Sequence, residues 1–118
     1  MISDLPIFKV YGAMAQHAAE TQRVSSENIA RAAEPGYKAM EVESFDSYMA
    51  RLQTNPEAMS GPPSFAISEA RTPVSPNGNS VSMEHEIFKS AEAGGQHNMA
   101  LSVYAKSMEL MKMAIGRR

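Results

Sequence analysis

The sequence predicts a mainly α-helical protein in which two long terminal helices pair and are joined by a long, largely irregular connector with one short strand. Apolar and small residues alternate at spacings of three and four in both terminal parts of the 118-residue chain. That spacing is typical of helices that pack along a seam. Six of the seven prolines fall instead within residues 34–80, and prolines interrupt helices and strands alike.

The first segment, residues 1–34, is predicted to be the N-terminal helix. Ser3 and Asp4 suit a cap, Pro6 suits the first turn, and the helical pattern runs from Ile7 to Ala33. The expected seam consists of Phe8, Tyr11, Ala15, Ala18, Gln22, Ser25, Ile29 and Ala32. Because these side chains become smaller and more polar along the helix, the seam should pack closely but weakly. Such a seam suits a helix that is shared among several subunits.

A Pro-Gly pair, Pro35–Gly36, is predicted to end this helix near Ala33. Proline biases the residue before it away from the helical region, and glycine accepts positive φ. Tyr37 and Lys38 then begin a loop.

The connector, residues 35–80, carries three weaker signals. Residues 45–52 predict two turns of helix, with Phe45, Tyr48, Met49 and Leu52 on one side. Residues 64–68 alternate apolar and polar side chains, which favours a short strand. Residues 76–79, Pro-Asn-Gly-Asn, predict a tight turn. A connector of this length is typical of a binding loop or of a region that is partly mobile in the free protein.

The last segment, residues 81–118, is predicted to be the C-terminal helix. Ser82 and the acidic residues after it suit a helix start, and the basic residues near the end suit a helix terminus. The expected seam consists of Ile87, Ser90, Gly94, His97, Leu101, Tyr104, Met108, Met111 and Ile115. The pair Gly94–Gly95 is consistent either with a kink or with a close approach of another helix.

No pattern in the chain is typical of catalysis, and we expect neither an enzyme nor a bound metal or cofactor. There is no cysteine, and the three histidines, His17, His85 and His97, are isolated from one another, whereas a structural zinc site needs about four ligands. No phosphate-binding glycine loop follows a strand. The net charge of −2 does not favour nucleic acid as a partner. The first ten residues lack the basic and apolar regions of a secretory signal, and no stretch approaches the roughly 20 apolar residues of a membrane span.

The residues at the end of the first helix resemble a known signature. Asn28-Ile29-Ala30 followed by Pro35-Gly36-Tyr37-Lys38 is similar to the N-terminal signature of bacterial flagellar rod, hook and hook-associated proteins. Arg31 stands where that family has a second asparagine, and Ala33-Glu34 replaces its usual step before proline. The chain length and the C-terminal helix look most like the proximal-rod members, which lack large outer domains.

This resemblance implies a non-enzymatic structural subunit of the basal-body rod, which transmits torque from the motor to the hook. It implies export by the flagellar type III apparatus without a cleaved signal, and location in the periplasm-spanning rod. The implied partners are further copies of the chain, other rod proteins and the export-gate adaptor at the rod base. No nucleic acid, small-molecule substrate or direct membrane insertion is expected.

Two sets of residues follow as candidate functional positions. The expected seam and assembly residues are Phe8, Tyr11, Ala15, Ala18, Ile29, Leu101, Tyr104, Met108 and Ile115. The expected helix-exit motif is Asn28, Ile29, Ala30, Pro35, Gly36, Tyr37 and Lys38. Two alternatives stay open: a cytoplasmic type III export chaperone or adaptor that binds a partner helix through a Met-rich face, and a small secreted helical-hairpin protein.

Overall fold

A computed structural model describes residues 6–116 of the chain. Its elements, in order, are α1 (Pro6–Ala30), β1 (Met40–Val42), α2 (Phe45–Thr54), the 3-10 helix η2 (Pro56–Ser60), β2 (Ile67–Glu69) and α3 (Met83–Gly116). The molecule is elongated, with principal extents of 67 × 28 × 16 Å. The predicted mainly α-helical fold, with long terminal helices and a short strand in the connector between them, is confirmed, and the strand belongs to a two-stranded sheet.

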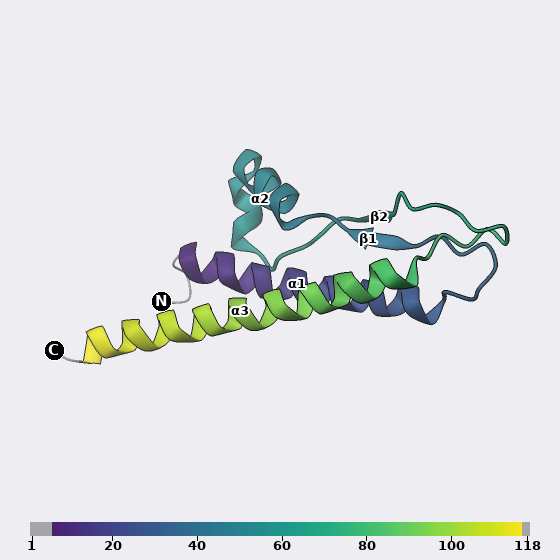
Figure 1. The fold of residues 1–118 in the computed structure, drawn as a ribbon. Coiled ribbons are helices and arrows are strands. Elements are labelled where there is room, and N and C mark those ends of the chain that lie inside the picture. The colour runs from purple at the N-terminus through teal and green to yellow at the C-terminus, as the bar shows by residue number, and fades with distance from the viewer. Residues whose placement is uncertain (1–5, 117–118) are drawn as a thin grey trace.

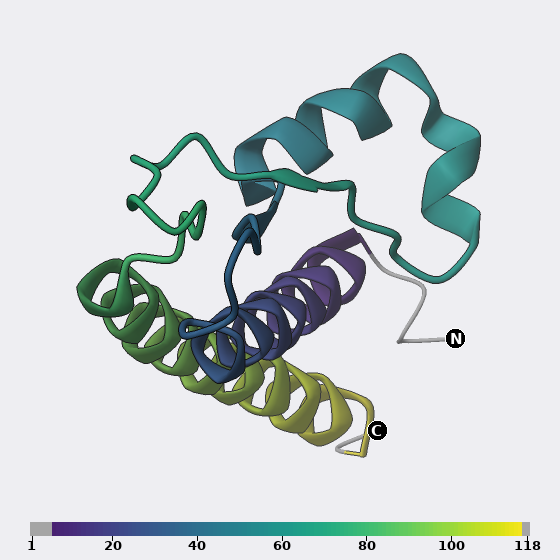
Figure 2. The ribbon, with the colours of Figure 1, turned by 90° about the vertical axis from the view of Figure 1, so that its right-hand side faces the viewer.

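The two terminal helices pack side by side and run in opposite directions (Figure 1). Seen nearly end-on, the helix pair forms one layer and the connector forms a second layer above it (Figure 2). The strands lie over the C-terminal half of α1, and α2 stands above its N-terminal half. The C-terminal end of α3 projects beyond the start of α1 (Figure 1).

The end of α1 differs from the prediction. The helix ends at Ala30 and not near Ala33. The Arg31 amide is shared between the carbonyls of Glu27 and Asn28, and the Ala32 amide bonds to Ile29, three residues back. The last turn therefore tightens before Pro35 is reached, as is common at helix ends. The predicted cap at Ser3 and Asp4 lies outside the described residues, and Pro6 opens the described helix.

The two strands form an antiparallel pair in which Met40, Glu41 and Val42 face Glu69, Ser68 and Ile67. The strand predicted at residues 64–68 is shifted to residues 67–69, and its partner β1 was not predicted. The ladder stops at Ala66 because the Ala66 amide donates to the Glu43 carboxylate, although the Ala66 carbonyl still accepts from the Glu43 amide.

The predicted helix at residues 45–52 is confirmed as α2. Ser44 caps it, since its hydroxyl accepts a hydrogen bond from the Ser47 amide. Tyr48 and Leu52 are buried against Ala13 of α1. The partly buried residues of this cluster are Phe45, Met49 and Phe65.

The start and continuity of α3 follow the sequence, but its seam does so only in part. Ser82 lies just before the helix, its carbonyl bonds to the Glu86 amide, and its hydroxyl accepts from the His85 amide. The buried residues of α3 are Glu86, Ala93 and Ala100, whereas the predicted seam residues Ile87, Leu101 and Ile115 are exposed. Ile87 and Leu101 each directly follow a buried residue, whereas the other predicted seam residues, apart from Ile115, are partly buried.

The helix is continuous through Gly94–Gly95. A Cβ atom at Gly94 would lie 3.0 Å from the side-chain nitrogen of Gln22 on α1, whereas one at Gly95 would meet no atom within 4 Å. Of the two interpretations left open by the sequence, close helix approach therefore applies at Gly94.

Candidate functional site at the exit of the first helix

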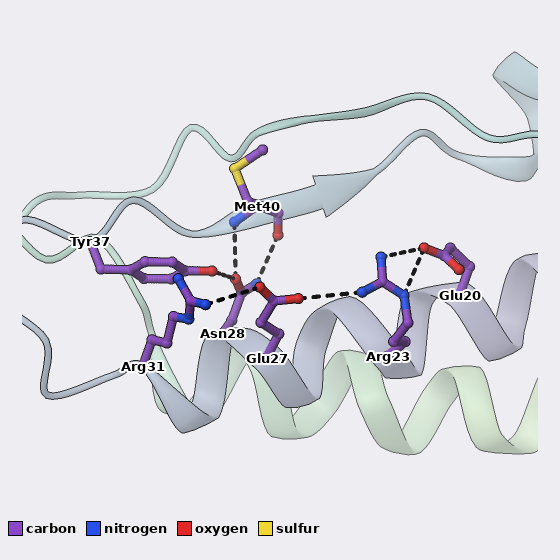
Figure 3. A network of polar contacts seen from close by, with 7 residues as sticks. All are labelled: Glu20, Arg23, Glu27, Asn28, Arg31, Tyr37 and Met40. Carbon is purple, nitrogen blue, oxygen red and sulfur yellow. Dashed lines mark hydrogen bonds and ion pairs between the residues drawn. The ribbon is translucent and has the colours of Figure 1, made fainter.

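Asn28, fully buried in the last turns of α1, is the centre of a polar cluster. Its side-chain oxygen accepts from the Tyr37 hydroxyl at 2.9 Å and from the Met40 amide at 3.0 Å. Its side-chain nitrogen donates to the Met40 carbonyl at 2.7 Å. Figure 3 shows Tyr37 and Met40 converging on Asn28 from the loop and from β1. The asparagine thus fastens the chain that leaves α1 back onto α1.

The second donor hydrogen of Asn28 reaches α3. The Asn28 amide nitrogen lies 3.1 Å from Oε1 of Glu86, which is also fully buried. The other carboxylate oxygen of Glu86 has no hydrogen-bond partner among the described residues, and neither does the buried Ser25 hydroxyl. Buried polar atoms are seldom left unpaired, so this contact is the least satisfied part of the cluster.

Two glycines allow the loops at this end to touch. Gly36 and Gly78 have φ of 77° and 86°, in the left-handed region that favours glycine. The Gly36 amide donates to the Asn77 carbonyl at 3.0 Å, and a Cβ atom at Gly78 would lie 3.1 Å from the Gly36 Cα. The turn predicted at residues 76–79 is present one residue earlier, over residues 75–78, where the Gly78 amide donates to the Ser75 carbonyl at 2.8 Å.

Asn79, which follows that turn, contacts the segment just beyond the end of α1. Its side-chain nitrogen donates to the carbonyls of Arg31 and Glu34 at 3.0 and 2.7 Å, and its oxygen accepts from the Val81 amide at 2.8 Å. These carbonyls lie just beyond the end of α1 and also accept from the amides of Glu34 and Tyr37, so Asn79 adds a second donor to each from a distant loop.

Further hydrogen bonds hold the segment that follows α1 against the loop that precedes α3, and we call this contact region the joint. The Ser80 hydroxyl accepts from the Ala39 amide at 2.8 Å, and the Ser80 amide donates to the Tyr37 carbonyl at 3.0 Å. The Lys38 ammonium donates to the Gly78 carbonyl at 2.7 Å. Sequence reasoning missed Asn79 and Ser80 as members of the site. The only signal for them was the turn composition that precedes them.

An exposed row of charges runs along α1 beside this joint. Arg23 pairs with Glu20 and Glu27, and Glu27 also lies 3.7 Å from Arg31 (Figure 3). The Arg31 guanidinium stands over the Tyr37 ring, 5.5 Å from its centre. Burial raises the pKa of the Tyr37 hydroxyl, so the ring remains a neutral hydrogen-bond donor. Exposed ion pairs contribute little to stability, but Arg31 covers one face of the Tyr37 ring.

One further contact joins the connector to α1, and another joins two segments of the connector to each other. The His17 Nε2–H donates to the Glu43 carbonyl at 2.6 Å, and the ring packs edge-on against Phe45 and Phe65. The Arg51 guanidinium donates to both oxygens of the Glu43 carboxylate, at 3.0 and 2.8 Å. The hydrogen bonds from Arg51 lower the pKa of Glu43, an effect that burial opposes and the Ala66 amide reinforces.

The candidate seam residues differ in burial, and the residues of the exit motif differ in whether they make contacts. Phe8, Ala15 and Ala18 are buried between the helices, and Tyr104 meets Phe8 edge-on with ring centres 5.3 Å apart. Leu101 and Ile115, in contrast, lie outside the seam within one chain. The partly buried candidates are Tyr11, Ile29, Tyr104 and Met108. Of the exit motif, Asn28, Gly36, Tyr37 and Lys38 contribute contacts to the joint, while Ala30 and Pro35 are exposed and contribute no side-chain hydrogen bond.

Clefts in the described part of the chain differ in their lining, and one of about 320 Å³ is lined by His17, Glu43, Asp46 and Glu92 among others. A half-open cleft of about 260 Å³ lies between α1 and α2 and is lined by Phe8, Tyr48, Leu52 and Tyr104 among others. Its described lining includes Lys9 but no histidine or carboxylate. Within residues 6–116, no group of three or more potential ligands is placed to hold a metal ion. None of the described helices is long and apolar enough to cross a membrane. No family model and no curated protein matches the chain.

Proposed function

We propose that this chain is a non-enzymatic structural subunit of the bacterial flagellar basal body, a proximal-rod protein of the FlgB type. It polymerises through its paired terminal helices and transmits torque from the motor to the hook. In this proposal the chain is exported through the flagellar type III apparatus, and its partners are further copies, other rod proteins and the adaptor at the rod base.

The observation that carries the proposal is the outer face of α3. Phe88, Met99 and Leu110 are 64%, 52% and 66% exposed. They are spaced at intervals of 11 residues, about three helical turns, and therefore lie on one side of the helix. Phe88 follows the buried Glu86 by two residues, or about 200° around the axis. This outer stripe thus faces away from α1.

Exposed apolar side chains on one side of a helix can pack against further helices, and the charged residues Glu92 and Lys106 lie between them on the same side. The opposite face of α3 carries the small residues that contact α1. A subunit with one face occupied within the chain and another left open suits repeated lateral assembly. The residues that resemble the flagellar signature hold the same helix pair together at its loop end, which agrees with a subunit built on that pair.

The test is the fate of the rod in a strain from which the gene has been deleted. We expect basal bodies purified from that strain to lack the rod in electron micrographs, and expression of the wild-type chain to restore it. Complete rods in the deletion strain would contradict the proposal.

Fractionation separates the proposal from its main rival. A rod subunit copurifies with basal bodies, whereas an export chaperone that binds partners through the methionines of α3 stays in the soluble fraction. Recovery of the chain in the culture medium would instead favour a secreted helical-hairpin protein.

A further inference from the structure

We propose that the buried Asn28–Glu86 pair specifies the axial register of α1 against α3, and that it does so at a cost in stability. This inference concerns the single chain and does not rest on the proposed function. It starts from the character of the interface, in which the side chains near the pair are small.

Apart from the pair, the described side-chain hydrogen bond between the two helices runs from the Gln22 amide to the Ser90 carbonyl, and a backbone carbonyl recurs at each turn of α3. Other buried residues of the two helices include Ala15, Ala18, Val24 and Ser25 on α1 and Ala93 and Ala100 on α3. Alanine and serine make similar contacts if one helix moves along the other by a turn. The large aromatic contact, Phe8 with Tyr104, lies near the opposite end of α1.

The orientation of the Asn28 side chain is determined by contacts other than the one with α3. Three of its hydrogen bonds go to Tyr37 and to the Met40 backbone, so the loop and β1 determine where its remaining donor points. That donor meets Glu86 at 3.1 Å. If α3 moved by one turn, Met83 or Ser90 would stand opposite Asn28, and Glu86 would lose the hydrogen bond from the Asn28 amide.

The incomplete hydrogen bonding of buried Glu86 lowers the stability of the folded chain and also penalises every register in which Glu86 loses Asn28. One Glu86 oxygen has no partner among the described residues. A buried carboxylate with incomplete hydrogen bonding is costly to remove from water. The free-energy cost of burying Glu86 is higher still in any register in which the Asn28 amide no longer donates to it. Single buried asparagines define the alignment of coiled coils in this way, at the expense of stability.

Disulfide trapping tests the inference directly, because the chain contains no cysteine. Gln22 lies beside Gly94, so Gln22→Cys with Gly94→Cys reports the native register. Gln22→Cys with His97→Cys reports a shift of about one turn, and Gln22→Cys with Leu101→Cys reports a shift of about two turns. Each reporter pair is combined with Glu86→Leu, and with Glu86→Gln as the matched control that retains an acceptor for Asn28.

We expect the wild type and Glu86→Gln to form the native disulfide alone. In Glu86→Leu, a shifted disulfide should form with a yield within a few-fold of the native one, and the midpoint of urea unfolding should stay the same or rise. A purely native disulfide pattern in Glu86→Leu would overturn the inference, whatever its stability.

A composition-matched exchange covers the case in which Glu86→Leu does not fold. Glu86→Ser with Ser90→Glu moves the carboxylate along α3 by about one turn. If the pair specifies register, the disulfide between positions 22 and 97 becomes the main product. If the disulfide between positions 22 and 94 remains the main product, the loops and not the pair set the register.

Discussion

At the scale of single residues, two buried asparagines join segments that are far apart in the sequence. Asn28 serves both the amide and the carbonyl of Met40, and Asn79 serves two carbonyls at the end of α1 and the Val81 amide. A carboxamide can do this because it carries donors and an acceptor on one short side chain. The sequence pointed to Asn28 through a resemblance, but nothing local in it pointed to the contacts of Asn79.

Asn79→Ala should destabilise the protein strongly. The change removes three hydrogen bonds and leaves the carbonyls of Arg31 and Glu34 without this donor, which predicts a loss of about 2–4 kcal/mol in the free energy of unfolding. Urea unfolding followed by circular dichroism measures it. The matched control is Asn98→Ala, because Asn98 is exposed on α3 and alanine suits a helix better. Equal stabilities for the two variants would show that the contacts of Asn79 are unimportant.

The Glu43–Arg51 pair predicts a pH dependence. Because the hydrogen bonds from Arg51 lower the pKa of Glu43 in the folded protein, its contribution to stability is complete above the ordinary value of about 4.5 and is lost as the pH falls through the lower folded value. The coupling between the residues should be below about 1 kcal/mol, since Arg51 is half exposed.

A double-mutant cycle with Glu43→Gln and Arg51→Gln, measured by urea unfolding at pH 7 and again at pH 3, isolates that coupling. The coupling free energy should be present at pH 7 and smaller at pH 3, because protonation of Glu43 removes its charge. A coupling that is unchanged at pH 3 would mean that the two side chains interact independently of the Glu43 charge.

At the scale of elements, the sequence predicted the helices well and their mutual faces less well. The seam of α1 could be predicted because Phe8 and the alanines after it share one face. The 3-4 spacing placed the seam of α3 on a set that includes Ile87, Gly94, Leu101 and Tyr104. Gly94 and Tyr104 meet α1, whereas Ile87 and Leu101 are exposed and the neighbouring Ala93 and Ala100 are buried. Close packing between helices requires small side chains where they touch, so spacing alone does not define the whole contact face.

The connector shows a second limit of local patterns. The helix α2 was predicted from its apolar side, whereas its cap Ser44 and its contact with Ala13 were not predicted. The strand β1 has three residues and no alternation that extends beyond them. It exists because β2 lies beside it and Asn28 bonds to Met40, and pairing at such sequence distance is invisible in either segment alone.

The two adjacent glycines of α3 provide a matched pair of tests. Gly95→Ala should stabilise the protein by up to about 1 kcal/mol, because alanine is the better helix former and its Cβ meets no atom within 4 Å. Gly94→Ala should gain less or nothing. Its Cβ would crowd the Gln22 amide, which donates to the Ser90 carbonyl at 3.3 Å.

Thermal unfolding of both variants beside the wild type decides the matter. A melting temperature for Gly94→Ala equal to or above that of Gly95→Ala would show that Gln22 does not hold the two helices in close contact. The double variant should behave as the sum of the singles, since Gly95 faces open space.

At the scale of the whole molecule, the exposed apolar residues on the outer face of α3 indicate that this elongated subunit associates with a partner. The helix pair buries few large side chains, and a small domain of this kind gains stability when neighbours cover its remaining apolar surface. The connector covers α1, whereas Phe88, Met99 and Leu110 are exposed on α3. We therefore expect association to depend on α3 far more than on the connector.

Replacing Phe88 and Leu110 by serine should weaken self-association without unfolding the chain. Both side chains are mostly exposed in the single chain, so the midpoint of urea unfolding at low concentration should change little. The concentration for half-association, measured by sedimentation, should rise at least about tenfold, which corresponds to about 1.4 kcal/mol. Val74→Ser is the control, because Val74 is an exposed apolar residue of the connector. If that control weakens association as much as the α3 variant does, the contact between copies lies on the connector and the outer stripe is not the assembly face.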